Sequence, residues 1–462
     1  MRGITSWGSY LPYRRLNRGE IAKLVGQGGG KGTRTVAGFD EDPTTMAVEA
    51  SRRALQGGAD PTLFLFATTN PAYADKTNAT AAHAALRLGD DVPAFDLGAS
   101  TRSAVGGLLL AARGSGDVLV AAADIRGGLA GSAEEAMGGD AAAAIVFGSG
   151  DVVAELIGSA SATHEFIDRW RAPGESRTKV WDDKFAETTY TKLGRQAWAA
   201  ALKSAGCQAT DVAMVAVAAP TTRIANAVGS KFGAGAVLDD LSATVGQTGA
   251  AQPALLLASL LEQAQSGQII ALAVLADGAD VLIFKTTEAL ASRDGRGLTV
   301  AEQAAGGAPL PYGKYLSWRG TITVEPPRRP EPARVSATAA ARGEDWKFGF
   351  VASRDQQSGQ IHMPPQRVSA DGLRTDAMEP QPMSEARGKV ITYTIDRMAY
   401  SPSPPIVFAV VDFDGGGRLP IELCDIDADE VEIGMPVELT FRRLFVQDGI
   451  PNYFWKARPV RG

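Results

Sequence analysis

Cysteine and histidine, which most often serve as nucleophile and as acid–base group near neutral pH, are scarce in this sequence. Among 462 residues there are two cysteines and three histidines. They are Cys207, Cys424, His83, His164 and His362. Two cysteines exclude a disulfide framework and a four-thiolate metal site. A mechanism that pairs a thiol with an imidazole therefore has few residues to use.

Two glycine-rich segments resemble ligand loops but lack the spacing that such loops require. GQGGGKGT, at residues 26–33, contains Lys31, which is followed by Gly32 and not by the Ser or Thr of a phosphate-binding loop. DFDGGGR, at residues 412–418, lacks the ligand spacing and the late Glu of a calcium loop. We expect a surface loop at the first segment and a hairpin connection at the second.

Strands and helices alternate twice along the chain, over residues 1–155 and again over 195–285. In the first stretch an apolar strand ends near Asp96, and the turn GASTRSAVGG joins it to an apolar helix. The repetition predicts an α/β class protein with a layered fold and two pseudo-symmetric halves. Five short alternating runs follow after residue 389, each bounded by Gly, Pro or Asp. They predict a C-terminal all-β barrel of the OB type.

These patterns divide the chain into five segments. We expect residues 1–155 and 156–290 to form the two α/β halves. Residues 291–345 are rich in Pro, Arg and Ala without sustained periodicity, which predicts a connecting arm. Residues 346–386 form a small separate segment, and residues 387–462 form the barrel.

The overall composition favours a cytoplasmic protein. The 46 basic and 52 acidic residues give a net charge of -6, and no block of Lys or Arg indicates a nucleic-acid groove. No apolar run has the length of a membrane span, and the N-terminal residues predict a strand and not a signal peptide. We therefore expect partners other than nucleic acid or membrane.

Several motifs in residues 1–285 resemble the thiolase superfamily, in particular its hydroxymethylglutaryl-CoA synthases and ketoacyl synthase III. The motifs, in the family's order, are VAGFDEDPTTMAVEA at 36–50, FDLGASTRSAVGGL at 95–108, ADIR at 123–126, GGDAAAAIVFG at 138–148 and VGQTGAAQPALLLASLLEQA at 245–264. The resemblance implies a thiolase-like fold, CoA or an acyl-CoA as candidate ligand, and a homodimer formed through this domain.

The same resemblance implies that the catalytic set of the superfamily is lost. In these enzymes a cysteine at a helix N-terminus accepts the acyl group, assisted by a His, an Asn and, in the synthases, a Glu. The cysteine position lies five residues after Asp96 and falls on Thr101. The His falls on Ala218, the Asn on Gln247 and the Glu on Thr69.

Other side chains are poor substitutes for the missing thiol. A Ser100 or Thr101 hydroxyl requires a general base, and no His, Lys or carboxylate occupies the matching family positions. Cys207 lies in a turn before a strand, where a structural thiol is expected. If the chain is nevertheless an enzyme, Tyr73 and Asp75, near the expected pocket, are the candidates for acid–base groups.

The C-terminal part resembles OB-fold proteins with a zinc ribbon, which accompany thiolases and thiolase-like aldolases. The motifs include YLSWRG, WKFGFVASR, HMPPQRV and NYFWKA. Such proteins normally hold zinc through two Cys-x-x-Cys knuckles. Residues 346–386 keep this spacing with Asp355, Ser358, Ser369 and Gly372 at the four ligand positions. We therefore expect a degenerate zinc ribbon, no zinc and no tightly bound cofactor.

Three functions remain open. The first is a non-catalytic or weakly catalytic scaffold that joins a thiolase-type catalytic subunit in a complex forming or cleaving C–C bonds of acyl-CoA thioesters. The second is an acyl-CoA condensing or retro-condensing enzyme, synthase-like or aldolase-like, with non-standard residues. The third is a CoA-thioester binding module without turnover. Loss of both chemical centres from one chain favours the first.

Overall fold

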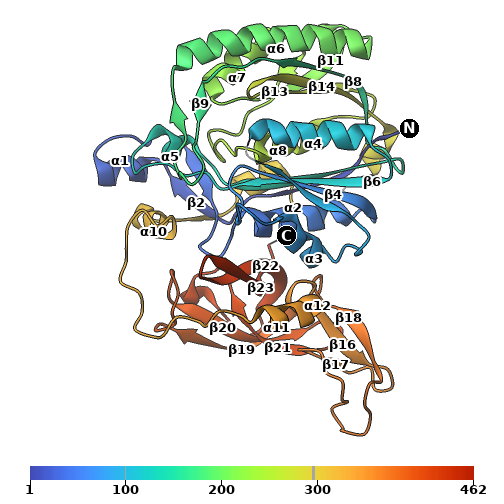
Figure 1. Cartoon of the computed structure of the whole chain (residues 1–462), viewed down its shortest axis with the longest axis vertical. Coiled ribbons are helices and arrows are strands. Elements are labelled where there is room, and N and C mark those ends of the chain that lie inside the picture. Colours follow the sequence, from blue (N-terminus) through green and yellow to red (C-terminus); the bar gives the residue numbers. More distant parts are fainter. Residues whose placement is uncertain (99, 294–296, 462) are drawn as a thin grey trace. The chain divides into compact units, whose positions relative to one another are not determined.

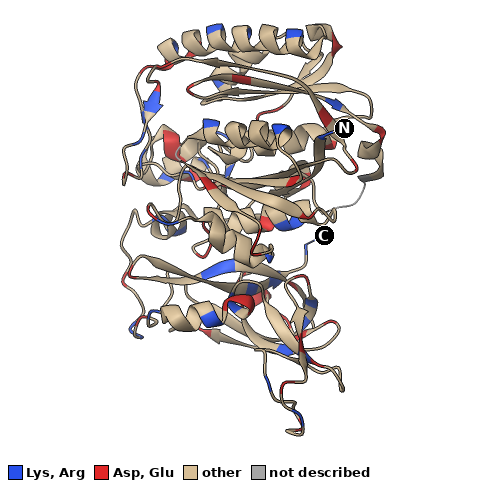
Figure 2. Ribbon diagram, turned by 45° about the vertical axis from the view of Figure 1, so that its right-hand side comes forward, with Lys and Arg blue, Asp and Glu red and all other residues tan. Residues whose placement is uncertain are grey.

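The computed structural model describes residues 1–98, 100–293 and 297–461. The chain divides into two compact units. Unit 1 comprises Met1–Ala37, Asp42–Thr80 and Asp90–Thr321, and unit 2 comprises Gly38–Glu41, Ala81–Gly89 and Ile322–Gly462. Figure 2 shows basic and acidic residues interspersed along the elements of both units. Within the described ranges, no helix has the length and apolar character needed to cross a membrane.

Unit 1 contains a ten-stranded sheet in the order β12-β11-β13-β14-β8-β1-β7-β6-β4-β5. Counted from each outer edge of the sheet, both halves have three mutually parallel strands, then two strands that pair antiparallel with their neighbours. The predicted pseudo-symmetry is therefore confirmed. The halves join where Gly3 and Ile4 pair with Glu155 and Ala154. The strands are β1 (Gly3–Tyr10), β4 (Pro61–Thr68), β5 (Ala94–Gly98), β6 (Asp117–Asp124), β7 (Ala141–Gly148), β8 (Ala154–Thr163), β11 (Val212–Ala218), β12 (Ala236–Val237), β13 (Ile269–Leu275) and β14 (Gly278–Thr286).

Two helices lie between the two groups of strands, and others cover the outer faces (Figure 1). The inner pair is α4 and α8; α2 covers β1 and β7, and α6 covers β8 and β14. The larger helices of the N-terminal 290 residues are α1 (Gly19–Val25), α2 (Pro43–Leu55), α3 (Ala79–Leu86), α4 (Thr101–Arg113), α5 (Ala133–Met137), α6 (Asp183–Ala205), α7 (Thr222–Gly229) and α8 (Ala251–Gln263).

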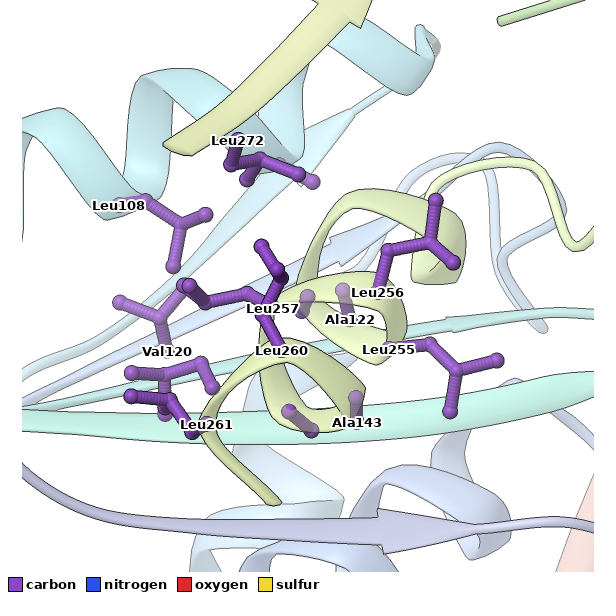
Figure 3. Packing of buried hydrophobic residues seen from close by; sticks show 14 of the residues in the cluster. Leu108, Val120, Ala122, Ala143, Leu255, Leu256, Leu257, Leu260, Leu261 and Leu272 are labelled. Atoms are coloured by element: carbon purple, nitrogen blue, oxygen red, sulfur yellow. The ribbon is translucent and has the colours of Figure 1, made fainter. Parts of the chain in front are cut away.

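Helix α8 is the centre of the hydrophobic core. Every residue from Ala251 to Leu261 is buried, as expected of a helix that is apolar on all sides. Figure 3 shows Leu257 and Leu260 of α8 among Leu108 of α4 and Val120 of β6. This packing fixes the N-termini of α4 and α8, which both reach the site described below.

Residues 297–321 differ from the prediction of a connecting arm over 291–345, of which residues 294–296 lie outside the described residues. They contain α9 (Val300–Ala305), β15 (Ala308–Pro309) and α10 (Tyr312–Trp318), and they belong to unit 1. β15 extends a small sheet with β2 (Arg14–Asn17) and β3 (Thr33–Val36). Tyr312 and Tyr315 are buried against Leu16 and Ile21. The predicted arm therefore began too early, because the Pro-, Arg- and Ala-rich composition of residues 291–345 does not extend evenly over the short elements that Tyr312 and Tyr315 anchor.

Unit 2 contains the predicted five-stranded closed barrel, in the order β19-β20-β21-β23-β22. The hairpin prediction for residues 412–418 is confirmed, since Asp412 pairs with Arg418 at the ends of β20 and β21. A three-stranded sheet, β17-β16-β18, precedes the barrel. The elements are α11 (Ala337–Arg342), α12 (Glu344–Lys347), β16 (Val351–Asp355), β17 (Ile361–His362), β18 (Met378–Pro382), β19 (Arg387–Asp396), β20 (Ile406–Phe413), β21 (Arg418–Leu423), β22 (Pro436–Gln447) and β23 (Ile450–Pro459).

Candidate functional site

A cavity of about 160 Å³ in unit 1 lies where strands of both halves end beside the N-termini of α4 and α8. The carboxyl ends of strands in α/β sheets are common ligand sites. The lining residues are Thr69, Ser100, Thr101, Arg126, Asp168, Arg169, Trp170, Arg171, Thr178, Tyr190, Ala218, Ala219, Pro220, Gln247, Gly249, Gln252, Leu275, Ala276 and Asp277.

The four positions that the resemblance assigned to lost catalytic groups all line this cavity. They are Thr69, Thr101, Ala218 and Gln247. β4 and β11 occupy equivalent places in the two halves, so Thr69 after β4 and Ala218 at the end of β11 reach the same cavity. None of the described lining residues is a cysteine or a histidine. Their correspondence to catalytic positions stays a prediction.

The N-terminus of α4 presents hydroxyls to the cavity. Ser100 is the N-cap: its Oγ accepts a hydrogen bond from the Arg102 backbone N–H at 3.1 Å. The same hydroxyl donates to Asp277 Oδ2 at 3.0 Å. The comparison of family positions missed this carboxylate, because Asp277 is 177 positions away in the chain. Thr101 begins the helix beside it.

Hydrogen bonds to the backbone of Asp277 hold this residue in place. It lies in the turn between β13 and β14 with a φ of 48°, in the left-handed region. Arg102 Nη1 donates to the Asp277 carbonyl at 2.8 Å, and the Asp277 N–H donates to Tyr190 Oη at 3.3 Å. Arg102 also forms an ion pair with the buried Asp280, with Nε and Oδ2 2.8 Å apart. These contacts position the Ser100–Asp277 pair.

A buried carboxylate joins the ends of β4, β6 and α8 beneath the cavity. Asp124 is 0% exposed and accepts from Thr68 Oγ1 at 3.0 Å, Thr69 N at 2.7 Å, Thr69 Oγ1 at 2.8 Å and Ala250 N at 2.7 Å. A β-carbon on Gly249 would lie 2.1 Å from Asp124 Oδ2, which explains the glycine in this turn. The Thr69 hydroxyl donates a hydrogen bond to Asp124, so its hydrogen is already engaged within the protein.

Three arginines on the cavity wall give the site a basic side. Arg126 Nη1 donates to Thr69 Oγ1 at 3.2 Å, and its Nη2 donates to Thr178 Oγ1 at 3.4 Å. Arg171 Nη2 donates to the Thr69 carbonyl, and Arg169 Nε forms an ion pair with Asp168 Oδ2 at 3.2 Å. None of these three arginines was predicted from the sequence to be part of the site.

The electrostatic environment of the wall disfavours the charged forms of two of its groups. Burial lowers the pKa of Arg126, Asp124 opposes this shift, and the charges of Arg171 and Arg169 lower the pKa further. Burial also raises the pKa of Tyr190, and the charge of Asp168 adds to this effect. Tyr190 therefore stays a neutral phenol that accepts a backbone hydrogen bond.

Tyr73 and Asp75 are not among the described residues that line the cavity. Tyr73 lies in the loop between β4 and α3, where its N–H donates to Asn78 Oδ1 at 2.9 Å. Burial, together with the charge of Asp42, raises the pKa of Tyr73. Tyr73 and Asp75 were predicted to lie near the expected pocket, and they follow Thr69 in the loop between β4 and α3.

Hydrogen bonds and one ion pair connect Asp355, Ser358 and Ser369, three of the four positions predicted for a degenerate zinc ribbon. Asp355 Oδ1 accepts from the N–H groups of Gln357 and Ser358 at 2.8 and 3.0 Å, and its Oδ2 accepts from Arg374 Nη2 at 2.9 Å. Arg374 N donates to Ser369 Oγ at 3.0 Å. The pair thus joins the turn that contains Ser358 to the turn that contains Ser369.

These residues do not fit a zinc ion. Gly372 has no side-chain ligand, and both oxygens of Asp355 are hydrogen-bonded. Among residues 1–98, 100–293 and 297–461, no group of three or more His, Cys, Asp or Glu side chains is arranged to hold a metal.

Arg374→Met is expected to loosen both turns of the ribbon. Hydrogen bonds from the Ser358 N–H and from Arg374 lower the pKa of Asp355 to about 2, below the ordinary value of about 3.9. A lowered folded-state pKa stabilises the fold above pH of about 4, and this contribution disappears as the pH falls toward about 2. The protection factors of the Gln357 and Ser358 amides, which are exchange rates corrected for the intrinsic effect of pH, are therefore expected to fall in Arg374→Met at neutral pH and in the wild type below pH of about 3.

Arg367→Met is the matched control, because Arg367 forms an exposed ion pair with Asp376 in the same segment. It is expected to leave the exchange of Gln357 and Ser358 unchanged. Equal effects of the two substitutions would contradict the role given to Arg374.

Comparisons with known proteins match both parts of the chain. The family described as "ChsH2, C-terminal OB-fold domain" matches residues 380–442. The hydroxymethylglutaryl-CoA synthase of Pyrobaculum arsenaticum is 27% identical over 347 residues, which cover 69% of this chain and 98% of that protein.

Solved structures show the same fold for the α/β part. A crystal structure of HMG-CoA synthase complexed with CoA has a TM-score of 0.59 at 18% identity, and covers 68% of this chain and 89% of that one. The 3-oxoacyl-[acyl-carrier-protein] synthase III from Aquifex aeolicus has a TM-score of 0.53 at 19% identity, with coverages of 62% and 100%. At these identities the structures establish the fold alone.

Proposed function

We propose that this chain, which joins a hydroxymethylglutaryl-CoA synthase-like domain to an OB-fold domain, is an acyl-CoA-binding scaffold subunit of a thiolase-type complex. A separate catalytic subunit forms or cleaves the C–C bond of the thioester. The observation that carries the proposal is the cavity itself. Thr101 and Ala218, which the resemblance places at the positions of the family's thiol and imidazole, both line it.

The chemistry of the cavity supports binding without covalent acyl transfer. A hydroxyl nucleophile needs a base to remove its proton while it attacks the thioester carbonyl. The Thr69 hydroxyl is hydrogen-bonded to Asp124, and the described lining contains no imidazole. The helix N-termini of α4 and α8 and the arginines of the wall remain, and these are groups that attract negative charge.

The partner side of the proposal rests on the C-terminal domain. The OB-fold domain resembles proteins that accompany thiolases, and the retained α/β fold is of the type that pairs with a second copy. We propose a heteromer with a thiolase-type catalytic subunit and a homodimer through the α/β domain, in the cytoplasm. We also propose that zinc takes no part, so that chelator treatment leaves the melting temperature unchanged.

The experiment compares the purified chain with the chain bound to its thiolase-type partner from the same organism. We expect calorimetry to detect binding of acetyl-CoA to the chain alone, and a thiol-release assay with acetoacetyl-CoA to detect no turnover above background. Turnover is expected only in the mixture. Turnover by the highly purified chain alone would contradict the scaffold role, and absence of binding would contradict the acyl-CoA ligand.

A second function is favoured by the Ser100–Asp277 hydrogen bond, which places a carboxylate beside a hydroxyl in the cavity. In that case the chain is itself a condensing or retro-condensing enzyme with non-standard residues. Asp277→Asn preserves the shape of the side chain but removes the base. If the purified chain turns over the thioester and Asp277→Asn abolishes this turnover, the second function replaces the first.

Thr101→Cys tests whether the frame of the nucleophile position is retained. A thiol at the start of a helix has a lowered pKa and is more reactive. Burial raises the pKa of both native thiols, Cys207 and Cys424, so the background is low. We expect iodoacetamide at neutral pH to label the introduced thiol roughly tenfold faster than Cys207. Equal labelling rates, measured by peptide mass spectrometry, would show that the position is not activated.

A further inference from the structure

We propose that Lys347 is a site of reversible carbamate formation, at which its side-chain amine combines with carbon dioxide. Lys347 is the last residue of α12 in unit 2, and α12 lies against α11, β16 and β23. It is not among the described residues that line the cavity of unit 1. The inference therefore goes beyond the proposed function and does not depend on it.

The amine of Lys347 is held in a partly buried position against β23. Nζ donates one hydrogen bond to Asn452 Oδ1 and a second, at 2.8 Å, to the carbonyl of Tyr453. The next residue of the chain is fixed to the same strand, because Trp455 Nε1 donates to the Phe348 carbonyl at 2.7 Å. These contacts restrain the side chain of Lys347 from turning out into solvent.

The amine of Lys347 has no counter-ion among the described residues. Its two acceptors, a side-chain amide oxygen and a peptide carbonyl, are both neutral. The nearest charged residues along the chain, Glu344 and Asp345 of α12 and Arg342 of α11, are exposed. A partly buried ammonium without a carboxylate is unfavourable. Burial accordingly lowers the pKa of Lys347 to about 8, and no neighbouring charge opposes this shift.

The charged groups on the two strands beside α12 are engaged elsewhere. On β23, Lys456 and Arg458 form ion pairs with carboxylates in other parts of unit 2. On β16, Asp355 pairs with Arg374, and Arg354 donates to a glutamine side chain. These groups therefore do not supply the missing counter-ion of Lys347.

The hydrogen bonds of Nζ suit the neutral form of the amine. A neutral amine has two N–H hydrogens and one lone pair, so the two acceptors on β23 satisfy both hydrogens and leave the lone pair free. This lone pair is a nucleophile, which the ammonium form lacks. The position of Lys347 at the end of α12 thus presents a fixed, partly neutral amine to small electrophiles.

The surroundings of Nζ select the kind of electrophile. Nζ lies 5.5 Å from the centre of the Phe348 ring, and Tyr453 beside it is only 2% exposed. A small uncharged molecule enters such a partly buried, aromatic environment at lower cost than a large anionic one. Carbon dioxide meets this condition, whereas a CoA thioester does not.

The reaction needs no further reagent. The lone pair of Nζ attacks the carbon of carbon dioxide and forms an N–C bond, one C=O bond gives its π electrons to oxygen, and Nζ releases a proton to water. The product keeps one N–H, which suits the Tyr453 carbonyl. Its new oxygens are acceptors for the side-chain N–H groups of Asn452 once that amide rotates. The charge of Lys347 changes from positive to negative.

The test traps the carbamate on the full chain in isotope-labelled bicarbonate at pH of about 7.5. Triethyloxonium ion alkylates a carbamate oxygen, and peptide mass spectrometry locates the modified lysine. At this pH a pKa of about 8 leaves roughly a quarter of Lys347 neutral, against about 0.1% for a lysine with the ordinary pKa of about 10.4. We expect at least about tenfold more trapped carbamate on Lys347 than on Lys389, an exposed lysine of β19. Equal trapping on the two lysines, or none on Lys347, would overturn the inference.

The variant Asn452→Asp supplies the missing counter-ion in a side chain of nearly the same shape. Its carboxylate favours the ammonium form, so trapping on Lys347 is expected to fall to the level of Lys389. Asn226→Asp, on an exposed residue of α7, is the matched control and is expected to keep the full trapping. Undiminished trapping in Asn452→Asp would overturn the inference.

A pH series on the wild type replaces Asn452→Asp if that variant unfolds. At a constant concentration of dissolved carbon dioxide, lowering the pH from about 7.5 to about 6 protonates the Lys347 amine. Trapping on Lys347 is expected to fall by more than about tenfold. Trapping that stays constant over this range would have the same consequence as undiminished trapping in the variant.

Discussion

Asp124→Ala is expected to lower the free energy of unfolding by about 3–5 kcal/mol, because each buried donor left without an acceptor costs about 1–3 kcal/mol. The substitution removes the acceptor of four hydrogen bonds from Thr68, Thr69 and Ala250. The side chain is 0% exposed, so water cannot take over these bonds without opening the core. Urea unfolding followed by circular dichroism measures the change.

Two further substitutions make the Asp124 experiment specific. Asp151→Ala, on an exposed residue of a loop, is expected to change the free energy of unfolding by less than about 0.5 kcal/mol. Asp124→Asn keeps the shape and one acceptor oxygen, so its loss is expected to be smaller than that of Asp124→Ala. A loss below about 1 kcal/mol in Asp124→Ala would show that Asp124 does not hold the ends of β4, β6 and α8 together.

Arg442→Met is expected to destabilise unit 2 by about 3–5 kcal/mol, because it leaves buried carboxylates without their counter-ion. Arg442 is 0% exposed; its Nη1 lies 3.1 Å from Glu41 Oε1 and its Nη2 lies 2.8 Å from Asp425 Oδ2. Lys456 lies beside it, with Nζ 3.0 Å from Asp40 Oδ2. Thermal and urea unfolding measure the loss.

Arg442, Lys456, Asp40, Glu41 and Asp425 form a buried charged cluster. The pKa of Asp40 shows how strongly this cluster depends on its two cations. Burial raises the pKa of Asp40, but the charges and hydrogen bonds of Lys456 and Arg442 outweigh burial and lower it overall. Without Arg442 the lowering weakens, so the variant is also expected to lose stability at a higher pH than the wild type during acid unfolding.

Arg418→Met is the control for the buried cluster, because Arg418 forms an exposed ion pair with Asp412. Exposed pairs contribute about 0–1 kcal/mol, so little change is expected. Similar losses in Arg442→Met and Arg418→Met would mean that the buried cluster contributes no more than a surface pair.

The order of strands and helices could be predicted because it follows from local patterns of apolar and polar residues. Apolar runs such as those of β6 and α8 have the period and length of their elements. The five barrel strands follow from short alternating runs between Gly, Pro and Asp residues. Helix α6 begins at Asp183, before residue 195 where the second alternation of strands and helices was predicted to start. Its first turn is mostly polar and exposed and therefore lacks an apolar pattern.

The candidate site was predicted only where residues lie in motifs. Thr101, Ala218 and Gln247 were assigned from the motifs that resemble the thiolase superfamily, and all three line one cavity. Asp277 and Arg171 were missed because they reach the site through a strand turn and a loop without a motif. The structure brings them there through long-range hydrogen bonds, such as Ser100 to Asp277, that sequence spacing does not encode.

Arg126 lies in a recognised motif, but its place in the site could not be predicted from that motif. The motif ADIR was recognised as part of the resemblance, but its arginine was not assigned a role. Its importance depends on its surroundings, namely the neutral Thr69 and Thr178 and the nearby Arg171. Such an environment arises from three separate segments and becomes visible only in the folded chain.

The most direct test of the central claim is intact-protein mass spectrometry of the purified chain after incubation with acetyl-CoA. Thr101 and Ala218 line the cavity, and under the proposed function the cavity binds an acyl-CoA without accepting its acyl group. We therefore predict an unchanged protein mass under conditions in which calorimetry shows acetyl-CoA bound. A mass increase of one acetyl group, mapped by peptide analysis to Ser100 or Thr101, would contradict the account.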